Sequence, residues 1–577
     1  MRKSRIVILL AVAALVSTVS TSAYSAAIPD EQFTVQNPPT NDRYTGINLE
    51  DTQKNRFTLT ELEARTADGT AYNSHLLSRT PCAKVGDTGC EIDKFFQYST
   101  ALAYCTSSLT SDCITSVFAK DANGNVVEGK FVESFPGETK YSFTGDPSLN
   151  LPPGGSTFIV DFPTLPHPGG TQYLVVANLV GAKQFGQSKF EINDFTAGIF
   201  AVSKVSGQFG IAEPETNADI RPDHTVGGRE YKGGGSGFYN GVNAIKTPCV
   251  QATKTSCLIS WPLALNVEFG MTMKLQTKLT GWIHGRVSDI DVAITKASDG
   301  DQVISVKGKP SVIPGVAAWY KKSDLPSGLQ TQYKSDLTVD SQGAGWPSLT
   351  GNSFGTDGLP YSILKEQFGY DTGSFNEILA WINAVSDKAT FAPTVWSIRS
   401  IGSGEIARCA SDQQSLSGFV TTNASMYVAS PPTYNAAEGT LDYKVIAPHY
   451  LPDGTEFKGM YNLVIKSDVA RCIYGFSAAP VKATISIVSA DGTAQVATTV
   501  VGEKDGWLYL SAKNFTFSSP TVKVKLTQDP TTVVKAPEVP AKVIAPKATK
   551  TITCAKGKSV KKVTGTKPAC PSGYKKK

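Results

Sequence analysis

The chain has 577 residues, a formal net charge of +5, 41% hydrophobic residues and 18% charged residues. Its 51 glycines and 33 prolines together give a combined content well below the ~25–30% that is typical of a low-complexity chain. These values exclude collagen, a long coiled coil and a wholly disordered protein, and at ~150 residues per domain the length predicts three or four domains.

Residues 1–27 have the pattern of a secretory signal. Basic residues at positions 2, 3 and 5 precede an apolar run, Ile6–Val16, and small residues continue to Ala27. The run is too short for the ~20 residues that span a bilayer. We therefore expect export with cleavage between residues 23 and 27, and no transmembrane anchor after cleavage.

The pattern of the remaining sequence mainly predicts short β-strands. Thr157–Phe162 and Gln172–Ala177 are rich in β-branched and aromatic residues, and Val481–Val488 alternates apolar and polar positions. Turn dipeptides such as Asn123-Gly124 and Asp491-Gly492 separate such runs. The pattern predicts an all-β fold of mainly antiparallel, sandwich-like domains stapled by disulfides.

One short amphipathic helix is expected near residues 374–387. Ser374 and Glu377 form a capping box, and Ile378, Leu379 and Ile382 follow at helical spacing. We interpret this helix as a packing element rather than as part of an active site.

Glycine-rich loops near residues 235 and 405 are the predicted domain boundaries. The predicted parts are a signal peptide (1–27), a β-rich domain (28–235), a β-rich domain with the helix (236–405), a β-sandwich (406–530), a Pro/Lys/Ala/Val linker (531–550) and a basic, disulfide-closed C-terminal module (551–577).

The ten cysteines are best read as disulfides because the chain carries an export signal. Spacing alone does not prove connectivity, but pairing near neighbours leaves no odd thiol. The predicted pairs are Cys82–Cys90, Cys105–Cys113, Cys249–Cys257, Cys409–Cys472 and Cys554–Cys570. With no C-x-x-C pair and five scattered histidines, we assign no metal ligand and no cofactor.

Charge is distributed unevenly along the chain. The signal carries +3 and residues 531–577, with twelve lysines and one acid, carry +11, so the total of +5 leaves −9 for residues 28–530. An acidic body argues against a nucleic-acid partner. The basic end suits an anionic envelope polymer, or alternatively serves only as a solubilising tail. The candidate envelope-binding residues are Lys556, Lys558, Lys561, Lys562, Lys567, Lys575, Lys576 and Lys577.

No motif assigns a catalytic residue. Gly351–Gly355 fits a nucleophile elbow but is flanked by loop sequences on both sides. Asp371–Ser374 lacks the second copy that an aspartic protease needs. Asp121–Asn125 resembles a calcium loop, but a hairpin turn explains it better. A carboxylate pair for glycoside hydrolysis needs no local spacing and stays open, as do the Trp and Tyr side chains as glycan platforms.

The last 27 residues resemble a terminal module of secreted actinobacterial proteins. The resemblance rests on the Ile-Thr-Cys start at Ile552, on Lys-Lys-Val-Thr-Gly565, and on the Pro-x-Cys-Pro and Gly-Tyr-Lys-Lys ending. More weakly, 279–286, 468–476 and 503–507 resemble uncharacterised secreted proteins of the same bacteria. The resemblance implies an envelope protein and brings no catalytic residue.

These observations lead to one main expectation. The chain is expected to be a secreted, cell-wall- or surface-associated structural or adhesion-type protein without enzymatic activity, held on anionic polymers by its basic C-terminal module. The alternatives are a secreted polysaccharide or peptidoglycan hydrolase, or an array of carbohydrate-binding modules.

Overall fold

The structure is a computed structural model. It describes residues 44–50, 60–65, 79–121, 123–137, 142–206, 249–252, 255–321, 324, 326–332, 362–365, 367–368, 372–401, 409, 415–477, 481–488, 492, 494–496, 498–517, 521–528, 550–557, 559–565 and 567–577. The chain divides into two compact units, Met1–Phe476 with Val481–Thr527, and Ser477–Pro480 with Gln528–Lys577. The predicted signal peptide lies outside the described residues, as does the predicted linker apart from Lys550.

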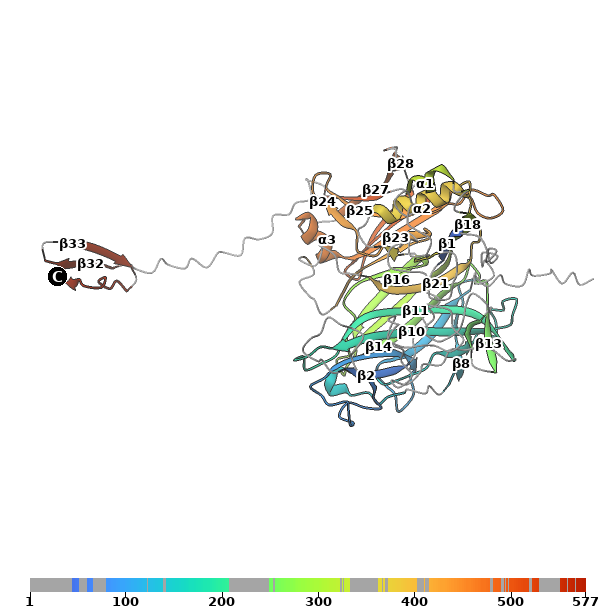
Figure 1. The fold of residues 1–577 in the computed structure, drawn as a ribbon, viewed down its shortest axis with the longest axis horizontal. Helices are drawn as coiled ribbons and strands as arrows, with labels where there is room; N and C mark the ends of the chain where they lie inside the picture. The colour runs from blue at the N-terminus through green and yellow to red at the C-terminus, as the bar shows by residue number, and fades with distance from the viewer. Residues whose placement is uncertain are drawn as a thin grey trace, which may run out of the picture. The chain divides into compact units, whose positions relative to one another are not determined.

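A large sheet, here called the central sheet, runs through the first unit (Figure 1). Its middle strands follow one another as β10 (Gln172–Lys183), β11 (Glu191–Ser206), β21 (Thr394–Ile401), β15 (Gly281–Gly285), β22 (Leu416–Thr422), β26 (Gly459–Lys466), β30 (Trp507–Phe515) and β29 (Thr498–Lys504). Among these neighbours, only β15 and β22 pair in parallel.

Shorter strands extend the central sheet at one side. They are β2 (Glu61–Arg65), β3 (Arg79–Pro81), β4 (Phe95–Ala101), β8 (Lys130–Ser134), β9 (Phe158–Asp161), β12 (Cys249–Ala252) and β13 (Ser256–Trp261). β11 pairs with both β13 and β21, and β15 pairs with β22. Strands that precede residue 235, strands between 235 and 405, and strands that follow 405 therefore pair in one sheet, although the sequence predicts domain boundaries at these two positions.

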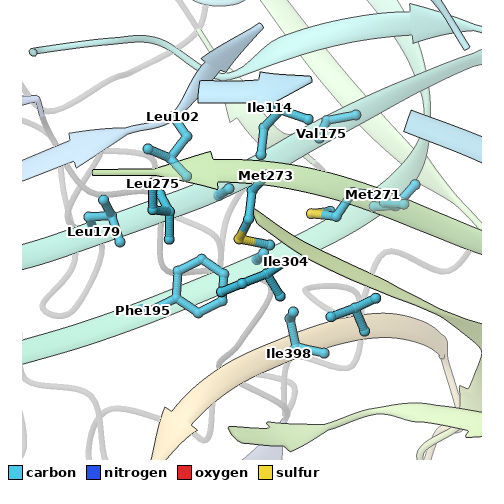
Figure 2. Close-up of a cluster of buried hydrophobic side chains, with 14 of the residues drawn as sticks. Leu102, Ile114, Val175, Leu179, Phe195, Met271, Met273, Leu275, Ile304 and Ile398 are labelled. Carbon is cyan, nitrogen blue, oxygen red and sulfur yellow. The ribbon is translucent and has the colours of Figure 1, made fainter. Parts of the chain in front are cut away.

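A second sheet packs on one face of the central sheet. It contains β5 (Ala103–Tyr104), β6 (Cys113–Lys120), β7 (Val126–Glu128), β14 (Glu268–Leu275), β16 (Val287–Lys296) and β17 (Gln302–Val312). Figure 2 shows the interface, where Met271 and Met273 of β14 and Ile304 of β17 meet Phe195 of β11 and Ile398 of β21. Burial of such side chains stabilises the pairing by ~25 cal/mol per Å² of apolar surface.

A third sheet packs on the other face. It is built from β20 (Gln367–Phe368), β23 (Met426–Val428), β24 (Thr433–Asn435), β25 (Thr440–Ile446), β27 (Val481–Val488), β28 (Ala494–Val496) and β31 (Thr521–Gln528). A smaller sheet joins β1 (Tyr44–Glu50), β18 (Val316–Lys321) and β19 (Ser362–Lys365).

Both faces of the central sheet are buried in these layers. On β15, Trp282 belongs to the core shared with the third sheet, whereas Ile283 belongs to the core shared with the second. Such strands need apolar residues on both sides, and β22 is buried at every position. Gly418 of β22 is required by close packing, since a Cβ there would lie 2.2 Å from the Trp282 ring.

The all-β prediction is confirmed, and the helix near 374–387 is present as α2 (Thr372–Ala384). It begins two residues before the predicted cap and stops because Ser386 and Asp387 adopt positive φ values. Ile378 and Trp381 pack it onto Met426 of β23 and Ile446 of β25 (Figure 1).

Two further helices are present that the sequence pattern did not predict. They are α1 (Ser327–Gln332) and α3 (Ser467–Tyr474). At six and eight residues, both are too short to show a clear helical period.

Candidate functional site

The C-terminal module is a three-stranded antiparallel sheet. β32 (Lys550–Lys556) forms a hairpin with β33 (Ser559–Gly565), and the short β34 (Lys575–Lys576) pairs with the other edge of β32. The Cys554–Cys570 disulfide ties the segment between β33 and β34 to the middle strand. Cross-linking is expected here, because a chain of this size buries too little apolar surface to fold alone.

Strand alternation gives this sheet two different faces. Cys554, Lys561 and Lys576 lie side by side in register, and Cys554 is completely buried. We call this the covered face. Ile552 and Val563 pair with each other on this face and are partly buried.

The opposite face, here called the open face, has a different composition. Val560, Ala555 and Lys575 lie in one register row, and Lys562 and Thr553 lie in the next. Lys562, Lys575 and Val560 are exposed, the last to 55%. Exposed lysines therefore lie on both faces of this sheet.

The structure exposes the predicted envelope-binding lysines that it describes. These are Lys556, Lys561, Lys562, Lys567, Lys575, Lys576 and Lys577, whereas Lys558 lies outside the described residues. Residues 550–577 contain no Asp or Glu, so no acidic side chain within the module offsets these charges. The cluster can attract a polyanion through long-range electrostatics.

The predicted disulfides are present wherever the structure describes both partners. The first unit contains Cys82–Cys90, Cys105–Cys113 and Cys409–Cys472. Cys257 is also disulfide-bonded, and the side chain of its predicted partner Cys249 lies outside the described residues.

The other sequence motifs do not assemble a catalytic centre in the described part of the chain. Gly351–Gly355 lies outside it, and Ser374 lies inside α2. Asp121 closes a hairpin turn between β6 and β7, accepting hydrogen bonds from the backbone N–H groups of Asn123 and Asn125. Among the described residues, no group of three or more His, Cys, Asp or Glu side chains is placed to hold a metal ion.

The tryptophans that the structure describes mostly pack in cores. Trp282, Trp381, Trp396 and Trp507 are buried, and Trp261 is partly buried with its Nε1 donating to Ser203 Oγ at 2.8 Å. The side chains of Trp319 and Trp346 lie outside the described residues. The described tryptophans therefore form no exposed stacking platform for sugars.

Sequence reasoning missed a nearly buried carboxylate pair. Asp112 precedes Cys113 and accepts a hydrogen bond from the Gln276 backbone N–H at 3.0 Å, while Asp301 accepts one from Ser111. Burial, reinforced by the charge of Asp301, raises the pKa of Asp112 to about 6. Asp301 also lies 3.5 Å from Lys274 Nζ. Because these carboxylates hold a loop against β14, we interpret them as structural.

The raised pKa of Asp112 predicts a pH-dependent stability. A group whose pKa is higher in the folded state stabilises the fold at low pH and loses that contribution as the pH rises through about 6. Asp112→Asn removes the buried charge, and Asn tolerates the positive φ of this position. We expect the variant to gain about 1–3 kcal/mol of unfolding free energy at pH 8 and clearly less at pH 4.5, which lies near the lower end of the window between 3.8 and about 6.

Urea denaturation at the two pH values measures this effect. Asp299→Asn is the control, because the hydrogen bond from Lys274 lowers the pKa of Asp299 below its ordinary value of 3.8, so its replacement should change the stability by nearly the same amount at pH 8 and at pH 4.5. An Asp112→Asn effect of equal size at both pH values would contradict the prediction.

A second buried polar group lies on the central sheet. Asn178, Thr196, Arg399 and His284 occupy one register row across β10, β11, β21 and β15, and all are buried. Burial, followed by the charges of Arg286 and Arg399, holds the pKa of His284 well below its usual value. The His284 ring stacks on Tyr427 with centroids 3.4 Å apart. His284 is therefore neutral and serves as a packing group.

Arg286 lies two residues after His284, directly beyond the end of β15, and is completely buried. Its Nη1 donates to the backbone carbonyls of Thr422 and Ala424 at 3.1 and 2.5 Å, and its guanidinium lies 4.7 Å from the Tyr427 ring centroid. These contacts fasten the central sheet to the strand β23 of the third sheet.

Two of the three segments of the weaker resemblance are in direct contact. In the remaining one, His284 and Arg286 both lie against Tyr427, and Trp282 belongs to the core on the same side of the sheet. The Arg471 guanidinium of the second segment donates two hydrogen bonds of 3.0 Å to the Glu503 carboxylate of the third segment.

In comparisons with known proteins, no protein-family model matches the chain, and no curated protein matches it either.

Proposed function

We propose that the protein is an exported, non-enzymatic component of the cell envelope, held on anionic wall or surface polymers by its C-terminal module. The observation that carries the proposal is the module itself, a disulfide-closed sheet whose described lysines are exposed and which contains no acidic side chain. Residues 28–530 carry a net charge of −9, so the positive charge of the mature chain is concentrated at its C-terminal end.

The disulfides support export. The structure contains four bridges whose two partners are both described, and such bonds persist in oxidising, extracellular environments. The pattern of residues 1–27 is that of a secretory signal. None of the described helices is long and apolar enough to cross a membrane. The resemblance of residues 551–577 to a module of secreted actinobacterial proteins points to the same compartment.

Co-sedimentation with isolated cell envelopes tests the proposal. Residues 28–577 and residues 28–530 are compared at low and high salt. The shorter form keeps all strands of the first unit and Gln528, whose Oε1 accepts a hydrogen bond from the Ser477 backbone N–H at 3.1 Å. We expect only the longer form to pellet, and salt to release it, because exposed charges are screened within ~10 Å at 0.1 M salt.

Two results would contradict this expectation. If both forms pellet alike, recognition lies in the β-sheets of the body, as a glycan-binding function requires. If neither form pellets, the anchoring role is wrong and a diffusible hydrolase becomes the function to test.

A further inference from the structure

The lysines of the two faces of the module have different surroundings. On the covered face, the Lys561 ammonium lies 5.5 Å from the centroid of the Tyr574 ring, and the Tyr574 hydroxyl lies 3.4 Å from Ser559 Oγ. Lys576 flanks the buried Cys554, whose bridge to Cys570 brings the returning chain over this face. Lys561 and Lys576 are exposed as well, but they lie beside this returning chain rather than on an uncovered strand surface.

The open face lacks such cover. Lys562 and Lys575 are exposed there, and neither has an ion-pair partner among the described residues. Two strand spacings of ~4.8 Å separate β33 from β34, and the two lysines are offset by two residues along the strands, so their backbones stand roughly 12 Å apart. Thr553 and Ala555 lie between them and leave room for a backbone to pass.

From this asymmetry we infer that the open face is the contact surface, and that its ligand is a linear anionic polymer rather than a lipid bilayer. The inference rests on the proposed function. Two cations on neighbouring register rows, separated by the small side chains of Thr553 and Ala555, complement a chain of repeating negative charges. Val560 is the one exposed large apolar side chain on the described part of this face, which gives little surface for insertion into a bilayer.

Two double variants of the full chain separate the faces. Lys562→Gln with Lys575→Gln alters the open face, and Lys561→Gln with Lys576→Gln alters the covered face. The variants have identical composition and charge, and the altered positions are adjacent in sequence. Mass spectrometry of the Cys554–Cys570 bridge and amide exchange of β32 verify that each module is folded.

Binding to linear poly(glycerol phosphate) is measured by calorimetry, beside vesicles of phosphatidylglycerol and phosphatidylcholine. We expect the open-face variant to bind the polymer roughly 30-fold more weakly and the covered-face variant to change less than about threefold. Unaltered protein should bind the polymer more tightly than the vesicles.

Each of the other outcomes would contradict a specific part of this inference. Equal losses in the two variants would refute the choice of face while leaving electrostatic anchoring intact. Tighter binding to the vesicles would refute the polymer as ligand. If the unaltered chain binds neither the polymer, the vesicles nor whole envelopes, the proposed function fails and this inference fails with it.

Discussion

Replacing Arg286 by methionine is expected to lower the free energy of unfolding by about 3 kcal/mol or more. The substitution keeps most of the side-chain volume but removes the N–H donors that satisfy the carbonyls of Thr422 and Ala424. A buried carbonyl left without a donor costs about 1–3 kcal/mol. The ring contact of Arg286 with Tyr427 is lost as well.

Chemical denaturation of the variant measures this cost. Arg286→Lys is a useful companion, because one ammonium keeps the charge but not the planar fork that reaches several carbonyls. It should recover less than half of the lost stability. As a control, Arg471→Met alters an ion pair nearer the surface and should cost less than about 1 kcal/mol. A methionine variant as stable as the parent would show that these carbonyls find other donors.

The second large effect concerns the C-terminal bridge. Replacing both Cys554 and Cys570 by alanine is expected to unfold residues 550–577 while the first unit stays folded. A loop of about 15 residues contributes on the order of 3 kcal/mol when closed, and a sheet of three short strands has little else to stabilise it. The hydrophobic cores of the first unit are built from that unit's own described residues.

Amide hydrogen exchange resolves the two units in one experiment. Protection of β32 and β33 should disappear in the double variant, whereas protection of β10, β11 and β26 should not change. Replacing Cys82 and Cys90 in the same way is the matched control, because that bridge closes a shorter loop against a large core. Retained protection in β32 would mean that the sheet is stable without its bridge.

The sequence was informative where structure depends on neighbours along the chain. The alternation of Val481–Val488 correctly indicated which side of β27 is buried, with Ile485 and Ile487 in the core. The near-neighbour disulfides and the Asp121 turn could be predicted for the same reason. The lysine cluster was visible as composition, but its division into two faces required the register of β32 with β33 and β34.

The sequence was uninformative where partners are distant. His284 and Arg286 alternate with small and apolar residues, as exposed positions of a strand often do. They are buried because the chain near residue 424 supplies carbonyls and an aromatic ring from another sheet. Asp112 gave no local signal either, because its burial depends on the backbone near Gln276. No periodicity within one strand specifies such partners.

If the chain is exported as we propose, the pairing of distant strands in the central sheet also bears on how it crosses the membrane. Thr196 pairs with Arg399, roughly 200 residues later, and β22 must be joined by β26 before its outer edge is covered. Closing loops of this length is slow, so topologies dominated by them fold slowly. A nascent chain that ends before β30 cannot complete the sheet, so under this proposal we expect it to remain unfolded during export. Folding would then begin outside the cell, where the short loops of Cys82–Cys90 and Cys105–Cys113 can be oxidised before the distant strands meet.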